Sequence, residues 1–336
     1  MKVPSVIFEA RQWAEGALQE EVGSLHPELA KVCGYVFGWR DEQGAPVQAR
    51  GSRYLHAALA MITGDQLGRR DSALASAVAH ELVHNLSLLH DDIIDDDDER
   101  RGRPAAHTVF GPSMAIIAGD AAIPLACGVL LREDNGRQAA RMLTGTVIDV
   151  VGGWSQDEAM AAAADLDTDV QEILCGVGYT LGPLLLHSSV RVASVLCGGQ
   201  PDALPGLIEA VGHAGQAWKT ANDAENYWDT GASGKQSLAD LRQGRITLPV
   251  VFAAVSSPSC RKKIEELWPR RTDEVVLAEL AGQITASSAK QMCTDLAAAA
   301  MSRAFQAVDS SDLRPDLQTK ITDLLLYITT RGQSHG

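Results

Sequence analysis

Apolar residues recur along most of this chain at the three- and four-residue spacing of α-helices, and short glycine, proline or aspartate pairs separate the periodic segments. Gly111-Pro112, Gly152-Gly153 and Gly198-Gly199 are examples of these separators. The sequence shows no strict alternation of apolar and polar residues around a hairpin turn, which is the pattern of exposed strands. We therefore expect an all-α protein. The predicted helices cover residues 7–23, 27–37, 53–63, 71–95, 112–131, 134–152, 157–174, 177–198, 203–228, 248–255, 259–267, 273–305 and 314–330.

The composition agrees with helices packed on helices. Aromatic residues make up only 5% of the 336 residues, whereas alanine and leucine are abundant, which favours helix bundles over β-sandwiches. No Pro/Ser-rich linker and no obvious internal repeat divides the chain. We therefore expect one all-α domain over residues 1–336, built around a central cavity.

Charge and cysteine usage narrow the class of protein. The net charge of −14 and the lack of a basic stripe argue against a nucleic-acid partner. The six cysteines have no CxxC pair or short Cys/His spacing, as expected for free thiols in a reducing compartment. The first residues lack the apolar stretch of a signal peptide, and no segment has the ~20 uninterrupted apolar residues of a membrane span. These features predict a cytoplasmic protein without an integral membrane segment.

The most informative segment is the acidic run at residues 90–98, which is followed closely by the pair Arg100-Arg101. Carboxylates this close raise one another's pKa, so we expect cations to neutralise them, and hard divalent ions with oxygen ligands fit best. Asp91 and Asp95 are four residues apart and share one helix face. The arginines supply forked donors that match phosphate oxygens. The run predicts a metal-bridged phosphate or diphosphate ester; the alternative, a solvated acidic loop, is disfavoured by the apolar helix that leads into it.

A second polar cluster lies at residues 215–249. A metal-bound diphosphate needs ligands from more than one helix, so we expect part of the site here. Asn222 and Asn226 are again four residues apart on one face of a predicted helix.

With both segments in view, the chain resembles the trans-isoprenyl diphosphate synthase family over about residues 45–255. The resemblance implies an all-α, isoprenoid synthase-type helical bundle in which two aspartate-rich motifs face each other across a deep apolar cavity. The family's first motif, DDxxD followed by RRG, is matched completely by Asp91, Asp92, Asp95, Arg100, Arg101 and Gly102. Further matches are Glu81, His84, Pro104, His107, Gly119-Asp120 and the run 234–249.

The resemblance also implies a role for each motif residue. Asp91 and Asp95 would bind two of three Mg²⁺ ions, for which Mn²⁺ can substitute, and Asp92 and Arg100 would complete the catalytic group. Arg100 would grip the diphosphate of a prenyl diphosphate substrate, and Lys235 would complete that grip. The remaining expected ligands of the diphosphate are Arg101, Lys219 and Arg245, and those of the metals at the second motif are Asn222, Asp223 and Asn226. A homodimer is the usual assembly.

The chain departs from the family at the site for the co-substrate, isopentenyl diphosphate. Elongating members carry a glycine-lysine-arginine-x-arginine-proline segment, and in the matching residues 51–56 Ser52 replaces the lysine and Leu55 the second arginine. His84 and Arg101, which serve the same site in the family, remain. Losing two charge-assisted contacts of ~1.5 to 3 kcal/mol each would weaken co-substrate binding by orders of magnitude.

Other departures point the same way. Asn222 and Asn226 stand where elongating members have aspartates, so the third metal would be held more weakly. Trp154 and Tyr179 replace polar residues of the family; their ring faces can stabilise a carbocation, or they are ordinary core residues. Trp218 replaces another aromatic residue. The residues expected to line the pocket are His84, Leu86, Ser87, Leu88, Trp154, Tyr179 and Trp218.

These departures favour a class I terpene cyclase that ionises one linear prenyl diphosphate, cyclises the allylic cation to a diterpene and releases diphosphate. Leu86 and Ser87 occupy positions that set pocket depth in the family and are not aromatic, so we expect geranylgeranyl diphosphate, with C15 or C25 substrates as alternatives. Two other hypotheses remain open. One is a chain-elongating prenyltransferase of the geranylgeranyl or farnesyl type that uses isopentenyl diphosphate. The other is a regulatory subunit of a heteromeric synthase, against which the intact first motif argues.

Overall fold

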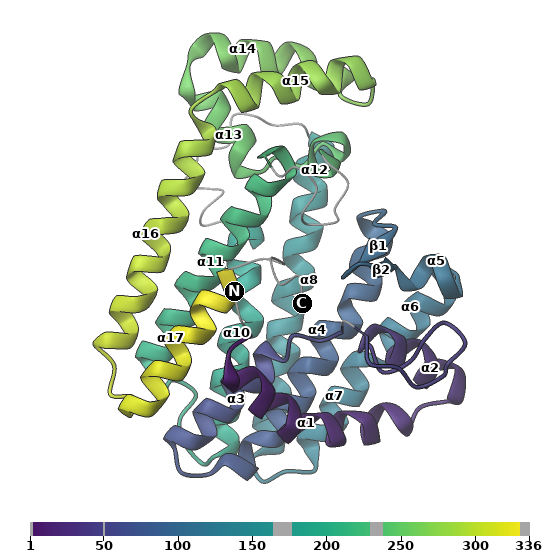
Figure 1. Ribbon diagram of the computed structural model, residues 1–336, viewed down its shortest axis with the longest axis vertical. Helices are drawn as coiled ribbons and strands as arrows, with labels where there is room; N and C mark the ends of the chain where they lie inside the picture. The colour runs from purple at the N-terminus through teal and green to yellow at the C-terminus, as the bar shows by residue number, and fades with distance from the viewer. Residues whose placement is uncertain (1–2, 50, 164–176, 229–237, 330–336) are drawn as a thin grey trace. The chain divides into compact units, whose positions relative to one another are not determined.

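The structure is a computed structural model that describes residues 3–49, 51–163, 177–228 and 238–329. Helices dominate these residues, which confirms the predicted all-α class (Figure 1). The chain forms two compact units, each of which is described by itself below. Unit 1 comprises Met1–Thr146, Leu185–Ile208 and Val308–Tyr327, and unit 2 comprises Val147–Leu184, Glu209–Ala307 and Ile328–Gly336.

Unit 1 contains most of the N-terminal helices. Its elements are α1 (Ser5–Gly23), α2 (Pro27–Val36), α3 (Leu55–Gln66), the 3-10 helix η1 (Arg70–Ala73), α4 (Leu74–Ile94), α5 (Ala106–Phe110), α6 (Pro112–Asp120) and α7 (Ala122–Leu131). Two short strands, β1 (Glu99–Arg100) and β2 (Arg103–Pro104), lie between α4 and α5.

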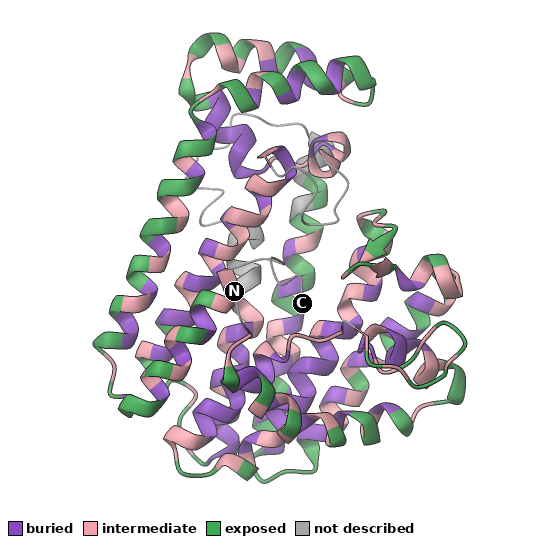
Figure 2. Cartoon of the chain, viewed as in Figure 1, coloured by how far each residue is buried: buried purple, intermediate pink, exposed green. Residues whose placement is uncertain are grey.

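The centre of unit 1 is α4, which packs against α3, α6 and α7. Every residue of α4 from 75 to 83 is buried, as Figure 2 shows for this helix and for α3. A helix surrounded on all sides belongs to the interior of its unit, so α4 is a rigid support for whatever lies at its C-terminal end. The acidic motif begins in its last turn.

Unit 2 contains α12 (Ala239–Gln243), α13 (Leu248–Ser256), α14 (Pro258–Leu267), the 3-10 helix η2 (Trp268–Arg270) and α15 (Glu274–Ala286). Five further helices have residues in both units: α8 (Gly136–Ala163), α10 (Val177–Leu196), α11 (Pro205–Trp228), α16 (Ala289–Asp309) and α17 (Pro315–Thr329). The core of unit 2 collects around Trp268, which is 2% exposed, with side chains from α13, α14 and α15.

Some predicted boundaries are wrong. The structure has a single helix α8 through Gly152 and Gly153, because a glycine inside a helix costs only about 1 kcal/mol relative to alanine. The helix predicted over 273–305 is divided into α15 and α16, and Ser287 Oγ accepts a hydrogen bond from Ala289 N at 3.1 Å at the break.

The segment Pro112–Leu131, predicted as one helix, is divided into α6 and α7. By length and composition it is the described segment that could cross a membrane, with a mean hydropathy of 2.0, and 39% of it is buried in the protein. Core helices pass the same test, and both α6 and α7 pack against α4, so the segment is weak evidence for a membrane span.

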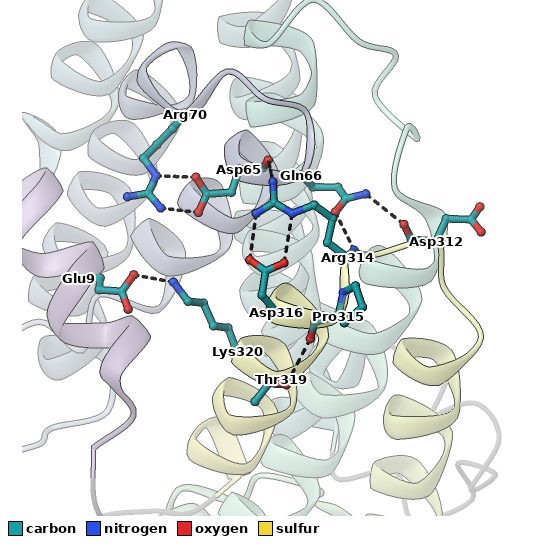
Figure 3. A network of polar contacts seen from close by, with 10 residues as sticks. All are labelled: Glu9, Asp65, Gln66, Arg70, Asp312, Arg314, Pro315, Asp316, Thr319 and Lys320. Carbon is teal, nitrogen blue, oxygen red and sulfur yellow. Dashed lines mark hydrogen bonds and ion pairs between the residues drawn. The ribbon is translucent and has the colours of Figure 1, made fainter.

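A polar clasp, made of Asp65, Gln66, Asp312, Arg314 and Asp316, holds the start of α17 against the end of α3 (Figure 3). Gln66 bridges the segments twice: its Nε2 donates to Asp312 O at 3.1 Å, and its Oε1 accepts from Arg314 N at 3.0 Å. Arg314 Nη1 also donates to Asp65 O at 3.1 Å. These contacts join parts of unit 1 that are far apart in sequence.

Candidate active site

The acidic motif lies at the C-terminal end of α4. Asp91 and Asp92 belong to its last turn, and Asp95 is the residue that follows the helix. A helix C-terminus carries partial negative charge, so carboxylates there need cations. Arg100 supplies one, with Nε 2.5 Å from Asp92 Oδ1 and Nη2 3.1 Å from Asp91 Oδ2. Burial raises the pKa of Asp92, although Arg100 opposes the change.

Arg100 and Arg101 lie on a β-hairpin that the sequence analysis did not predict. β1 pairs antiparallel with β2, and the two turn residues, Arg101 and Gly102, have φ angles of 57° and 75°. Two successive positive φ angles match the twist of a tight hairpin, and Gly102 adopts its angle without strain. Arg101 therefore stands in a left-handed conformation that is rare for its residue type. The turn aims the two adjacent arginines at different partners on α4, because Arg101 Nη1 donates to Asn85 Oδ1 at 3.1 Å.

Arg101 belongs to a basic cluster with Arg53 and His84, in which the two arginines carry the positive charge. Burial, followed by the charge of Arg100, lowers the pKa of Arg101 to about 10, so its guanidinium stays protonated at neutral pH. Burial lowers the pKa of His84 well below its usual value, and the charges of nearby groups, Arg101 and Arg53 among them, lower it further. Both arginines act electrostatically on the His84 imidazole, and Arg53 also acts on Arg101, so the three side chains lie near one another.

Arg53 is held by the C-terminal helix. Its Nη2 donates to Tyr327 O at 2.6 Å, and its guanidinium carbon lies 4.5 Å from the centroid of the Tyr327 ring. The sequence analysis counted the cations lost at Ser52 and Leu55 and did not weigh Arg53. The sequence did contain a signal for this residue. Of the two arginines in the family's glycine-lysine-arginine-x-arginine-proline segment, this chain keeps the first, as Arg53.

The loop that carries Ser52 is fastened to α4 by Glu81, a carboxylate that is 0% exposed. Glu81 Oε1 accepts hydrogen bonds from the backbone N–H groups of His56 and Ala57, at 3.0 and 3.1 Å, which caps the first turn of α3. Glu81 Oε2 accepts from the Ser52 hydroxyl and from Asn85 Nδ2. Ser52 thus takes part in anchoring the loop.

The predicted pocket residues of α4 differ in exposure. Leu86 is buried, and Ser87 is half-buried with its hydroxyl donating to His84 O at 2.9 Å. Leu88 lines a cleft. The other residues that line this cleft are Tyr35, Val36, Leu89, Asp92, Arg100, Arg101, Arg103 and Ala106.

The second motif lies on α11, in unit 2. Asp223 is buried and pairs with Lys219, whose Nζ is 2.7 Å from Asp223 Oδ1. Asn226 Nδ2 donates to Asp240 Oδ2 at 2.6 Å. Arg245 lies 3.8 Å from Asp240 and 3.6 Å from Glu158. Lys219 and Arg245, predicted as diphosphate ligands, thus have acidic neighbours in unit 2.

Of four other predicted residues, the structure describes the side chains of two. Trp154, on α8, and Trp218, on α11, are half-buried. Tyr179 falls on α10, but its side chain lies outside the described part of the structure, as does Lys235.

The donor atoms of both motifs fit a hard divalent cation. The oxygens Asn222 Oδ1 and Asn226 Oδ1 are buried and have no hydrogen-bond partner among the described residues. A buried carbonyl oxygen without a partner is costly, and a cation relieves that cost. In unit 1, Asp91 and Asp95 have carboxylate oxygens of the kind that Mg²⁺ prefers. Within the described residues, no three His, Cys, Asp or Glu side chains are already gathered as a metal site.

The pattern that defines the polyprenyl synthetase family matches residues 46–284 of this chain. The chain belongs to the polyprenyl synthetase family. It is 28% identical to a (2E,6E)-farnesyl diphosphate synthase of Mycobacterium tuberculosis, across 97% of this chain and 92% of that protein. It is 30% identical to a geranylgeranyl diphosphate synthase of the same organism, across 79% of this chain and 76% of that protein. A crystal structure of a polyprenyl synthetase from Streptomyces coelicolor A3(2) matches with a TM-score of 0.83 and 29% identity, over 98% of this chain and 100% of that chain.

The expected terpene cyclase is wrong. The relatives of this polyprenyl synthetase are named farnesyl, geranylgeranyl and solanesyl diphosphate synthases, which are chain-elongating prenyltransferases. The prediction rested on the cations missing at Ser52 and Leu55, on Asn222 and Asn226 in the second motif, and on the aromatic replacements Trp154 and Tyr179. It did not weigh Arg53, which acts electrostatically on His84 together with Arg101.

Proposed function

We propose that this polyprenyl synthetase is a chain-elongating trans-prenyltransferase that joins an allylic prenyl diphosphate to isopentenyl diphosphate and releases diphosphate. The observation that carries the proposal is the cluster of the cations Arg53 and Arg101 with the neutral His84, because a co-substrate diphosphate needs such a cluster and a single-substrate cyclase does not. The names of the relatives support farnesyl or geranylgeranyl diphosphate, C15 or C20, as the product. The non-aromatic side chains of Leu86 and Ser87 are compatible with either length.

The first motif would serve the allylic diphosphate. We assign Asp91 and Asp95 to Mg²⁺ from the first motif, and Asn222 and Asn226 from the second. When bound, Mg²⁺ would neutralise the negative charge that develops on the leaving diphosphate. Arg100, already paired with Asp91 and Asp92, would share its donors with the diphosphate oxygens, since a guanidinium has five N–H groups.

The other predicted site residues would either support a cationic side chain or contact the allylic substrate. Asp92 would hold Arg100 in place, and Asp223 would do the same for Lys219. Lys219, Lys235 and Arg245 would contact the allylic diphosphate. The predicted aromatic residues Trp154, Tyr179 and Trp218 would contact the hydrocarbon chain.

The co-substrate would bind at Arg101 and Arg53. Condensation breaks the allylic carbon–oxygen bond, with the electron pair leaving on diphosphate, forms a carbon–carbon bond to the double bond of isopentenyl diphosphate, and releases one proton. Because the pKa of His84 is depressed, its imidazole is neutral at pH 7 and adds hydrogen-bonding capacity without charge.

We also propose a homodimer. Ile116 and Ile117 on α6 and Leu131 on α7 are large apolar side chains that are 43%, 52% and 59% exposed, and a partner copy would cover them. A cytoplasmic location stays a prediction.

The test is a substrate matrix with purified protein and Mg²⁺. Dimethylallyl, geranyl and farnesyl diphosphate are each incubated with labelled isopentenyl diphosphate, and the products are separated by chain length. Incorporation of label into C15 or C20 diphosphates is expected, and Asp91→Asn is the inactive control. Release of diphosphate from geranylgeranyl diphosphate alone, without incorporation in the other incubations, would overturn the proposal. No reaction in any incubation would favour a regulatory subunit.

A further inference from the structure

Asn85 occupies the space between a buried carboxylate and the guanidinium of Arg101. It lies on α4 and is 0% exposed. Its Oδ1 accepts from Arg101 Nη1 at 3.1 Å, and its Nδ2 is 3.0 Å from both Glu81 Oε2 and Ser52 Oγ. The amide therefore presents its acceptor to the cation and its donors to the anion. The reverse orientation would place like partial charges together, so the surroundings fix the direction of the amide.

Glu81 is engaged elsewhere. Its carboxylate accepts hydrogen bonds from two backbone N–H groups of α3 and from the hydroxyl of Ser52, as well as from Asn85. Its charge nevertheless acts on Arg101. If Arg101 paired directly with Glu81, the carboxylate would neutralise the guanidinium and occupy some of its N–H groups. Fewer donors would then be available to an incoming anion. Asn85 separates the two groups while it still orients the guanidinium.

Arg101 is arranged for a ligand. Within residues 3–49, 51–163, 177–228 and 238–329, its side chain makes one hydrogen bond, to Asn85 Oδ1. A guanidinium has five N–H groups in a planar fork, so most of the donors remain for diphosphate oxygens. The positive φ of Arg101 places the residue on a tight turn, where the backbone has little freedom to redirect the side chain. The single acceptor on Asn85 then sets the direction of the fork.

We infer that Asn85 is a positioning residue for the co-substrate: it orients Arg101 toward the diphosphate of isopentenyl diphosphate and keeps Glu81 from pairing with it. This inference rests on the proposed elongating function. In this chain Asn85 acts together with Ser52, whose hydroxyl shares the amide donor and the same carboxylate oxygen. Ser52 replaces the family's lysine and supplies no positive charge. The affinity for the co-substrate therefore depends more strongly on the orientation of the Arg101 guanidinium.

Two substitutions test this role. Asn85→Asp keeps the shape and puts a carboxylate against Arg101; Asn85→Ala removes the acceptor and adds no charge. A control is Asn135→Asp, the same chemical change at an exposed asparagine whose Nδ2 donates to Val195 O at 3.3 Å. Circular dichroism and thermal melting establish which variants fold.

The experiment compares the change in KM for isopentenyl diphosphate with the change in KM for the allylic substrate. In Asn85→Asp we expect KM for isopentenyl diphosphate to rise at least tenfold and KM for the allylic substrate to change less than twofold. In Asn85→Ala the rise is expected to be about fivefold, and Asn135→Asp should match the unaltered protein. A purely structural role for Asn85 would change both Michaelis constants, or kcat, together. If Asn85→Asp does not fold, Asn85→Ala gives the same comparison.

Failure of the inference is distinguishable from failure of the proposed function. If the unaltered protein elongates prenyl chains and both folded Asn85 variants keep KM for isopentenyl diphosphate within twofold, the inference is overturned and the function stands. If the unaltered protein shows no elongation, calorimetric titration with isopentenyl diphosphate alone decides. Binding that weakens at least tenfold in Asn85→Asp supports the positioning role, and equal binding refutes it.

Discussion

His80 is a completely buried base in the middle of α4, and its ring has partners for both nitrogens. Nδ1 lies 2.8 Å from Ser76 O, which can only accept, so Nδ1 carries the proton. Nε2 lies 2.9 Å from Ser188 Oγ and therefore accepts. Burial, with the charge of His56 as a further cause, lowers the pKa of His80 to about 3. Burial also lowers the pKa of His56 to about 4.

These shifts predict a loss of stability on acidification. The unfolded chain binds a proton at each of these histidines below the usual pKa of 6.5, whereas the native state does not until pH 3 to 4. Between those limits the unfolded state binds more protons, so the free energy of unfolding falls as the pH falls. At pH 5.5 an ordinary histidine is about nine-tenths protonated, which gives a loss of about 1.4 kcal/mol for each residue relative to pH 8.

The variant His80→Asn isolates one of the two contributions. The asparagine Nδ2 can still donate to Ser76 O, while no titratable group remains at the position. Urea denaturation at pH 8 and pH 5.5, followed by circular dichroism, should show a pH-dependent loss that is about 1.4 kcal/mol smaller in His80→Asn than in the unaltered protein.

A control variant is needed to distinguish a general decrease in the free energy of unfolding from a change in the protonation of His80. Val78→Ala, at a position that is 2% exposed on the same helix, removes packing without changing any titratable group, so its pH-dependent loss should equal that of the unaltered protein. If His80→Asn also loses as much stability between pH 8 and pH 5.5 as the unaltered protein, the depressed pKa of His80 is refuted.

Three further outcomes are expected. Asp91→Asn and Asp95→Asn should each reduce kcat about 10²-fold or more, because each weakens the binding of Mg²⁺, whose positive charge would offset the leaving diphosphate; near-normal diphosphate release in either variant would contradict the metal assignment. Ser52→Lys restores a cation beside the cluster and should lower KM for isopentenyl diphosphate about tenfold, the equivalent of one charge-assisted contact of about 1.5 kcal/mol; an unchanged KM in steady-state assays would argue against a role for charge at this position. Gln66→Ala removes both bridging hydrogen bonds of the polar clasp in Figure 3 and should lower the free energy of unfolding by about 1 to 2 kcal/mol in urea denaturation; no loss would show that water replaces these bonds without cost.

Local features of the sequence predicted most of the helices and the first motif. The spacing of apolar residues gave α4 and its end, because helix formation and the burial of one element depend on residues that are neighbours in the chain. Asp91 and Asp95 were found for the same reason. The predicted end of a helix at Gly152-Gly153 failed because packing along α8 outweighs a weak local preference.

The hydrogen bonds that hold the loop of Ser52 to α4 could be predicted only in part from the sequence. Asn85 lies four residues after Glu81, so the two share a helix face, and this spacing was the available signal. Nothing in the sequence joins that face to Ser52 or to Arg101, which come from a loop and from a hairpin turn. Such contacts bring together residues that are distant along the chain, and local patterns do not encode them.

The sequence by itself determined the helical class and the carboxylates at the end of α4, because these follow from periodicity and from the charge of adjacent residues. It predicted a diphosphate as ligand on the same basis. Only the tertiary structure decided how the cations are distributed: Arg100 toward Asp91 and Asp92, Arg101 toward Asn85, and Arg53 against Tyr327. Electrostatic potential depends on distances in space and on burial, and neither can be obtained by counting charges at two positions of a motif.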